Sequence, residues 1–318
     1  MKNKVPLVSV IIATINRKEM LLRCIDSVLK STYPKIEIVI CEDPSTNEAR
    51  ESILNRYSRY KNIIYIKNKT RLLKPASLNK AIRASKGTFL FHLDDDNVVH
   101  KKCITELVST MHKFPKVGVV EALAFYYSHQ NIIMHAGTER SRFMRGYQSP
   151  FSNERWRNQF KEGYEIGNAD NAYMIRKKAI KAAGMYDLLS YYNEGAELQA
   201  RIKKAGYSIV INPKAKTYHD VPYRPISNAR YLFSERVNRY SVYHIMYSKI
   251  LYEFRYEKTV QKLTFLISLP LYLGFYVDAI ITKHVDVRTK FGLIGLLLKG
   301  TARGFVDAAR VKQQIEYL

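Results

Sequence analysis

Cysteine is scarce in this sequence of 318 residues. The three cysteines, Cys24, Cys41 and Cys103, are widely spaced and odd in number. This spacing excludes a disulfide framework and the paired-cysteine patterns of zinc sites, so we expect a chain that works in a reducing compartment. Internal repeats and low-complexity tracts are also lacking, which excludes a repeat architecture.

Acidic residues are few as well. Aspartate and glutamate number 28 against 52 lysines and arginines, which gives a formal net charge of +24. Such an excess favours an anionic partner, either nucleic acid, nucleotide phosphates or an acidic membrane face. Hydrophobic residues make up 47% of the chain, which is enough for a large core in one domain or two.

The first residues imitate a secretory signal, because Lys2 and Lys4 precede an apolar run from Val5 to Ile15. No small-residue cleavage site follows, and the run is rich in β-branched residues. We therefore predict that this run forms a first buried strand.

Between residue 5 and about 127, strand-like apolar runs alternate with helix-like segments. In one of these segments Leu21, Leu22, Ile25 and Val28 keep the spacing of a helix face. Apolar strands that alternate with helices predict a mostly parallel sheet covered on both faces. The predicted strands are 7–14, 36–41, 62–67 and 88–93, and the predicted helices are 18–30, 47–57 and 76–84.

Polar side chains follow three of these strands. Thr14 ends the first, residues 41–45 end the second, and three consecutive aspartates, residues 94–96, end the fourth. Ligands of parallel sheets bind outside the carboxyl ends of the strands. Clustered carboxylates need a positive partner, and carboxylates separated by one residue suit a hard divalent cation that bridges to a diphosphate. Alternatively, residues 95–97 only cap a helix that starts near Lys101.

Five segments resemble, in order and spacing, the motifs of the family 2 glycosyltransferases. The segments are VSVIIATINR (8–17), IVICEDPST (38–46), KPASLNKAI (74–82), GTFLFHLDDDN (87–97) and NEGAELQARIKKAGY (193–207). The resemblance runs from about residue 7 to 220. It implies a GT-A fold, which is α/β and Rossmann-like with a mostly parallel sheet flanked by helices. It also implies a nucleotide-sugar donor, a divalent metal (Mn2+ or Mg2+) and inversion at the anomeric carbon.

The resemblance implies roles for single residues. Asp94 and Asp96 match the aspartates of a D-x-D motif, and Asp96 would hold the metal and count as catalytic. His219 resembles a histidine that many relatives carry near the metal, although a core histidine is the alternative. Asp43 matches the position that usually pairs with the nucleobase, so we expect uridine diphosphate as the nucleotide. Nucleotide-sugar contacts are expected from Ala13, Thr14, Asp43, Arg71, Lys74, Asp94 and Asp95.

The sequence departs from the family at the catalytic base. Relatives usually read Glu-Asp-x-Asp/Glu-Leu, and the aspartate in the second position acts as the catalytic base. This chain has Gly195 at that position. We expect Glu194, one residue earlier, to act as the base for a hydroxyl acceptor. Alternatively, a lipid phosphate acceptor is already ionised and needs no base, or Glu194 only stabilises the start of a helix that runs to Ala205.

Residues 138–165 are basic and aromatic and read poorly as regular structure, as does the whole interval 128–170. In GT-A enzymes this interval is where acceptor loops are inserted. Basic residues interleaved with aromatics also suit single-stranded RNA. No nucleic-acid module signature is present, and the aspartate cluster would repel a polyanion, so we expect no nucleic-acid partner.

The C-terminal third differs in composition, and we predict a catalytic domain over 1–222 and a helical region over 223–318. Residues 226–258 read as a long helix, and 263–281 are apolar with interruptions at Pro270 and Gly274. We expect this stretch and 291–300 to form a pair of amphipathic helices that lie on a membrane with anionic lipids, or a shallow hairpin in it, at the cytoplasmic face of the cell membrane. The alternative is that the same surface forms a helical cap or a homodimer contact. The basic residues expected at the headgroups are Lys283, Arg288, Lys290, Lys299 and Arg303.

The sequence therefore predicts an inverting, metal-dependent glycosyltransferase that moves a sugar from a nucleoside-diphosphate sugar to a lipid-linked or glycan acceptor at the membrane. Two alternatives remain at this point: a nucleotidyltransferase with a similar sheet, and a non-catalytic protein that binds nucleotide-sugar or RNA.

Overall fold

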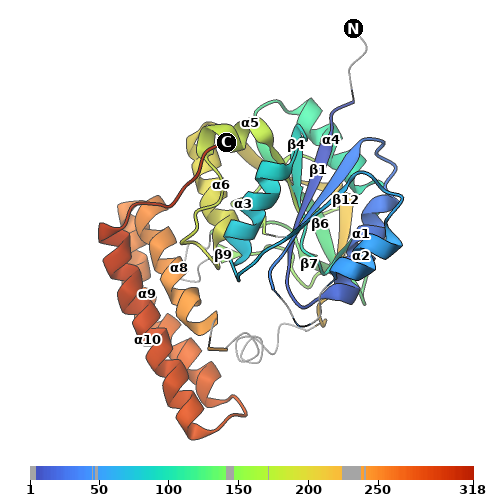
Figure 1. Ribbon diagram of the computed structural model, residues 1–318. Helices are drawn as coiled ribbons and strands as arrows, with labels where there is room; N and C mark the ends of the chain where they lie inside the picture. The colour runs from blue at the N-terminus through green and yellow to red at the C-terminus, as the bar shows by residue number, and fades with distance from the viewer. Residues whose placement is uncertain are drawn as a thin grey trace.

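The computed structural model describes residues 5–44, 46, 49–140, 147–170, 172–223, 238–239 and 241–318. Its centre is a ten-stranded mixed sheet in the order β10-β12-β6-β11-β4-β1-β2-β3, with β5 paired to β12 and β7 paired to β6 (Figure 1). The strands are β1 (Val8–Thr14), β2 (Ile36–Glu42), β3 (Ile63–Lys67), β4 (Phe89–His92), β5 (Asn97–Val99), β6 (Val117–Tyr126), β7 (Ile133–His135), β10 (Tyr164–Glu165), β11 (Tyr173–Arg176) and β12 (Ser208–His219), and a separate ribbon pairs β8 (Glu139–Arg140) with β9 (Tyr147–Gln148).

The four predicted strands are confirmed, and they pair in parallel as β3-β2-β1-β4. β6 and β12 are also parallel to each other. Between the two groups lies β11, which is antiparallel to both β4 and β6. The predicted α/β class is therefore correct, with an antiparallel strand in the middle of the sheet that the sequence did not reveal.

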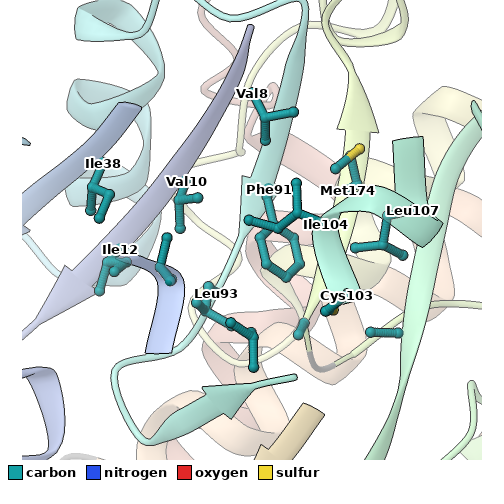
Figure 2. Packing of buried hydrophobic residues seen from close by; sticks show 14 of the residues in the cluster. Val8, Val10, Ile12, Ile38, Phe91, Leu93, Cys103, Ile104, Leu107 and Met174 are labelled. Carbon is teal, nitrogen blue, oxygen red and sulfur yellow. The ribbon is translucent and has the colours of Figure 1, made fainter. Parts of the chain in front are cut away.

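Helices cover both faces of the sheet, and two apolar clusters lie between them and the strands. The helices are α1 (Lys18–Leu29), α2 (Arg50–Arg56), α3 (Lys74–Ala84), α4 (Cys103–Lys113), α5 (Lys177–Ala183) and α6 (Glu194–Lys204). Because side chains alternate along a strand, Val8, Val10 and Ile12 of β1 face α1, α2 and α4, whereas Ile11 faces α3, α5 and α6. Figure 2 shows the first cluster, where Phe91 and Met174 of the strands lie against α4 residues such as Ile104.

Three helices form a bundle beside the α/β domain: α8 (Ser241–Tyr256), α9 (Thr259–Ile281) and α10 (Val287–Arg310) (Figure 1). Part of the helix predicted at 226–258 lies outside the described residues. α8 and α10 pack closely because α10 presents Gly300 and Gly304, one turn apart, to α8. A Cβ at Gly300 would overlap the backbone of Tyr243. Small residues spaced four apart allow such close approach of two helix backbones.

Residues 311–318, here called the return segment, run from α10 back to the loop between α5 and α6 (Figure 1). The backbone N–H of Gln314 donates to Oδ1 of Asp187 at 3.0 Å, and Arg255 of α8 makes an ion pair with the other carboxylate oxygen at 3.1 Å. Asp187 is fully buried. The loop that leads into α6 is therefore held by both α8 and the return segment, so the two predicted domains share contacts.

Candidate active site

The carboxyl ends of β1 and β4 bring Thr14 and the aspartates together. The Thr14 hydroxyl donates to Oδ2 of Asp95 at 2.6 Å. Nη1 of Arg17 lies 3.1 Å from Oδ1 of Asp95 and 2.7 Å from Oδ2 of Asp96, so one guanidinium bridges two carboxylates. Arg17 therefore supplies part of the positive charge that the aspartate cluster requires. The sequence prediction missed this residue, although it closes the segment VSVIIATINR.

Asp95, one of the two carboxyl groups in this bridge, has a raised pKa. Burial raises the pKa of Asp95 to about 6, and the opposing effects of Arg17 and the Thr14 hydroxyl do not offset it. The nearby charges of Asp96 and Asp94 add to the increase. A carboxyl group that titrates near neutral pH in a cluster of acids is typical of a functional site.

A second bridge links Asp94 to the helix that carries the predicted base. Nζ of Lys74 lies 2.9 Å from Oδ1 of Asp94 and 3.1 Å from Oε1 of Glu194. Burial opposes the charge on both partners, yet the ammonium of Lys74 and the imidazole of His92 hold the pKa of Asp94 well below its usual value. The carboxylates of Asp94 and Glu194 raise the pKa of Lys74 well above its usual value, against the effect of burial.

His219 reaches the cluster because β12 pairs with β5, and His219 lies opposite Asn97 in that register. Its Nε2 is 3.1 Å from Oδ1 of Asp96. Among the described residues, no group of three histidine, cysteine, aspartate or glutamate side chains converges to hold a metal alone. Asp96 and His219 nevertheless suit Mn2+ or Mg2+, since such ions use one or two protein ligands beside substrate phosphates and water. The distance between the two side chains also fits, because neighbouring ligands of an octahedral ion stand about 3 Å apart.

Asp43 lies at the same edge, where its backbone N–H donates to the carbonyl of Thr14 at 3.0 Å. Its buried carboxylate accepts bonds from the side chains of Asn68 (2.8 Å) and Ser77 (3.1 Å) and from the backbone of residues 72 and 73. Asp43 thus fixes the loop that precedes α3. The exposed Arg71 belongs to this loop, and Ala13 comes directly before Thr14. The expected contacts of these residues with a nucleotide remain predictions.

The region of Gly195 is lined by polar groups. A Cβ built on Gly195 would lie 3.2 Å from the hydroxyl of Tyr173 and 3.6 Å from Nε2 of Gln199. The Gln199 amide exchanges two hydrogen bonds of 2.7 Å with the backbone of Ala169. Glu194, at the first position of α6, points to Lys74 instead. The structure therefore forms two sets of contacts, which meet where Asp94 and Asp95 follow each other in the chain. One set joins Thr14, Asp95, Asp96 and His219 through Arg17, and the other joins Asp94 to Lys74 and Glu194.

Solved structures show that this is the GT-A fold of glycosyltransferases. The mannosyltransferase PcManGT from Pyrobaculum calidifontis, in complex with GDP-Man and Mn2+, matches with a TM-score of 0.59 at 14% identity, covering 96% of this chain and 88% of that one. GalNAc-T7 with UDP, GalNAc and Mn2+ matches with a TM-score of 0.65 at 17% identity, covering 96% and 58%.

The family is shown by sequence. The chain belongs to glycosyl transferase family 2, whose model matches residues 9–181. An uncharacterized glycosyltransferase of Methanocaldococcus jannaschii is 29% identical over 141 residues, 43% of this chain and 49% of that protein. The UDP-Glc:alpha-D-GlcNAc-diphosphoundecaprenol beta-1,3-glucosyltransferase of Escherichia coli is 30% identical over 128 residues, 40% and 49% respectively. The match thus spans about half the length of these two curated relatives.

Proposed function

We propose that this glycosyltransferase moves a sugar from a nucleoside-diphosphate sugar, with inversion, to a hydroxyl of a lipid-linked or glycan acceptor. The observation that carries the proposal is the convergence of Asp94, Asp96, Lys74 and Glu194 at one edge of the sheet. Lys74 is the cation placed to stabilise negative charge on a leaving diphosphate. A divalent metal held by Asp96 and His219 would act there as a Lewis acid when bound.

Glu194 is proposed as the general base. Its side chain is 12% exposed and lies against Lys74, so it belongs to the same site as the D-x-D aspartates. Glu194 is the first residue of α6. Its side chain reaches the site from the position just before Gly195, which has no carboxylate. An acceptor hydroxyl needs such a group to take its proton as the bond to the sugar forms.

Uridine diphosphate is the nucleotide we expect. Asp43 lies at the correct edge, but both of its oxygens already accept hydrogen bonds from the loop before α3. A contact with the uracil imide would therefore need that loop to exchange one of these bonds. A panel of nucleotide-sugars scored by thermal shift with Mn2+ or Mg2+ tests this proposal, and an equal shift for every nucleotide would contradict it.

A membrane location is proposed from α9. This helix of 23 residues is long and apolar enough to cross a membrane, and its exposed side chains between Leu263 and Phe275 are apolar or glycine. The E. coli relative is named for a diphosphoundecaprenol substrate, which fits an acceptor at the membrane. Basic residues on and before α10, among them Arg288 and Arg303, suit anionic headgroups, and we place the protein at the cytoplasmic face.

Transfer assays with radiolabelled nucleotide-sugars test the function. A glycosyltransferase releases a free nucleoside diphosphate and transfers the labelled sugar to the acceptor or, slowly, to water. A nucleotidyltransferase would break the bond between the two phosphates of the same donor and release a sugar 1-phosphate, and a protein that only binds nucleotide-sugar would release neither product. Either of the last two results would overturn the proposal.

A further inference from the structure

A buried hydrogen-bond chain leads from Tyr173, beside Gly195, to Asp94. The hydroxyl of Tyr173 lies 2.9 Å from that of Tyr186, and the Tyr186 hydroxyl lies 2.7 Å from Nδ1 of His92. Nε2 of His92 lies 3.2 Å from Oδ1 of Asp94. The three linking side chains are almost fully buried and come from β11, the loop before α6, and β4.

This chain is part of a ring that is closed by one packing contact, in which the Tyr173 hydroxyl lies against Gly195. Asp94 pairs with Lys74, Lys74 pairs with Glu194, and Glu194 is followed by Gly195, against which the Tyr173 hydroxyl lies. The ring therefore joins the end of β4 to the start of α6 by two routes. One route is exposed in part and contains the charged groups of the site, whereas the other is buried and contains only His92 and the two tyrosines.

The direction of the hydrogen bonds follows from the chemistry of the groups. A carboxylate can only accept, so His92 donates to Asp94 through Nε2. In a neutral ring Nδ1 then accepts from Tyr186, and Tyr186 in turn accepts from Tyr173. Burial raises the pKa of both tyrosines, so the two hydroxyl groups keep their protons. The Asp94 oxygen that meets Lys74 is the same one that His92 holds.

We propose that His92, Tyr186 and Tyr173 are positioning residues of the transfer reaction, which hold Asp94 and the start of α6 so that Lys74 stands between Asp94 and Glu194. The inference rests on the proposed function. Without the buried route, the Asp94 carboxylate would be free to turn away from Lys74, and Lys74 would no longer be held between Asp94 and Glu194.

Removal of single hydroxyl groups tests the proposal against a purely structural role. Tyr186→Phe and Tyr173→Phe keep the aromatic rings and break the hydrogen-bond chain. Tyr33→Phe is the control, because it removes a hydroxyl that donates to the carbonyl of Pro6, outside the ring of contacts. We expect all three variants to lose a similar amount of stability in urea unfolding. Only the first two should lose tenfold or more in kcat, with the donor Kd within threefold of wild type. A kcat within threefold of that of Tyr33→Phe would overturn the proposal.

Two substitutions of His92 test its contacts with Asp94 and with Tyr186 separately. His92→Gln carries an amide nitrogen near the place of Nε2 and can still donate to Asp94, whereas His92→Asn reaches only toward Tyr186. If the role is to position Asp94, His92→Gln should keep at least a third of the wild-type kcat and His92→Asn should lose tenfold or more. Equal loss in both variants would contradict a positioning role.

A measurement on the wild-type protein reads the direction of the hydrogen bonds without any assay of activity. Nitrogen-15 NMR of labelled histidine should show the ring of His92 protonated at Nε2 and not at Nδ1, with its signal assigned by its loss in His92→Gln. Protonation at Nδ1 alone would overturn the proposed direction of the chain. If wild-type protein transfers no sugar from any donor, the proposed function fails, whereas an active wild type with unaffected tyrosine variants refutes only the positioning role.

Discussion

Nζ of Lys74 lies 3.1 Å from Oε1 of Glu194, and each residue is the first of its helix, α3 and α6 respectively. The partial positive charge at a helix start favours Glu194 but disfavours a lysine. Lys74 is kept there by the two carboxylates that flank it. A diphosphate that arrives at this point would gain from both the ammonium and the start of α3, so the locally unfavourable position of Lys74 is explained by the proposed function.

Replacement of Glu194 by glutamine tests the base. Glu194→Gln keeps the shape and removes the proton acceptor, so transfer to a hydroxyl should fall about 100-fold or more while donor binding persists. Glu194→Asp shortens the arm and should lose transfer as well. The measurement is transfer of labelled sugar together with donor binding by calorimetry. Near-normal transfer by Glu194→Gln would show that Glu194 is not the base and would favour an ionised phosphate acceptor.

Replacement of Asp96 by asparagine tests the metal site. Asp96→Asn removes an anionic ligand with little change in volume, so metal-dependent transfer should fall at least tenfold, about 1.4 kcal/mol of barrier. Asp26→Asn is the control, because Asp26 bonds Arg56 and Tyr57 outside the site. The assay is transfer titrated with Mn2+, and full activity of Asp96→Asn at unchanged metal dependence would refute the assignment.

The exposed face of α9 is expected to bind lipid. Ile267 and Leu271 are 67% and 61% exposed. The double variant Ile267→Glu with Leu271→Glu should lose tenfold or more in affinity for liposomes with anionic lipids, because charged groups do not enter the acyl region. Leu54→Glu, at a 49% exposed position on α2, should bind as wild type does. Unchanged lipid binding with a loss of dimer in sedimentation velocity would assign the face to a second copy instead.

Two glycines of α10 should respond to alanine in opposite directions. At Gly300 a methyl group would overlap the backbone of Tyr243, so Gly300→Ala should destabilise the protein by about 1–3 kcal/mol. At Gly295 no neighbour lies within 4 Å, so Gly295→Ala should stabilise it by about 0.5–1 kcal/mol through helix propensity. Urea unfolding measures both changes. Equal effects would show that α8 and α10 do not pack at Gly300.

Stability should depend on pH through His135, whose Nδ1 lies 3.0 Å from Oε1 of the buried Glu121. Burial lowers the pKa of His135, but Glu121 and Asp170 raise it above its usual value. A raised folded pKa gives stability that is complete below the unfolded pKa of about 6.5 and is lost as the pH rises through the folded pKa. Urea unfolding between about pH 6 and 9 should therefore show a steeper fall for wild type than for His135→Asn. Parallel curves would contradict this assignment.

The sequence predicted the parallel half of the sheet because its signals are local. Each of β1 to β4 is a mostly apolar run, and the polar residues at the ends of β1, β2 and β4 follow directly along the chain. β11 carries no such signal of direction, since its antiparallel pairing depends on how the chain returns after β6. α10, expected at 291–300, extends over Val287–Arg310, because basic residues interrupt the apolar run without ending the helix.

The sequence provides candidate site residues where they fall in motifs, and it gives no sign of side chains that meet across the fold. Asp94, Asp96 and Lys74 stand in recognisable segments, and in the structure Lys74 pairs with Asp94 whereas Asp96 contacts His219. The bridge made by Arg17 depends on the turn between β1 and α1, and the meeting of Tyr173 with Tyr186 depends on the loop before α6. Spacing in the sequence carries no information about such contacts.

The return segment also sets an order of folding. The loop between α5 and α6 makes some of its hydrogen bonds with Gln314 and Glu316. In the sequence these two residues come after α8, α9 and α10. These partners emerge from the ribosome only after α8, α9 and α10 have been made, so the loop before α6 is incompletely bonded while the strands of the sheet are already synthesised. Long-range closure of this kind is slow compared with local helix formation. Catalytic competence would then appear late in synthesis, after the whole three-helix bundle has been made.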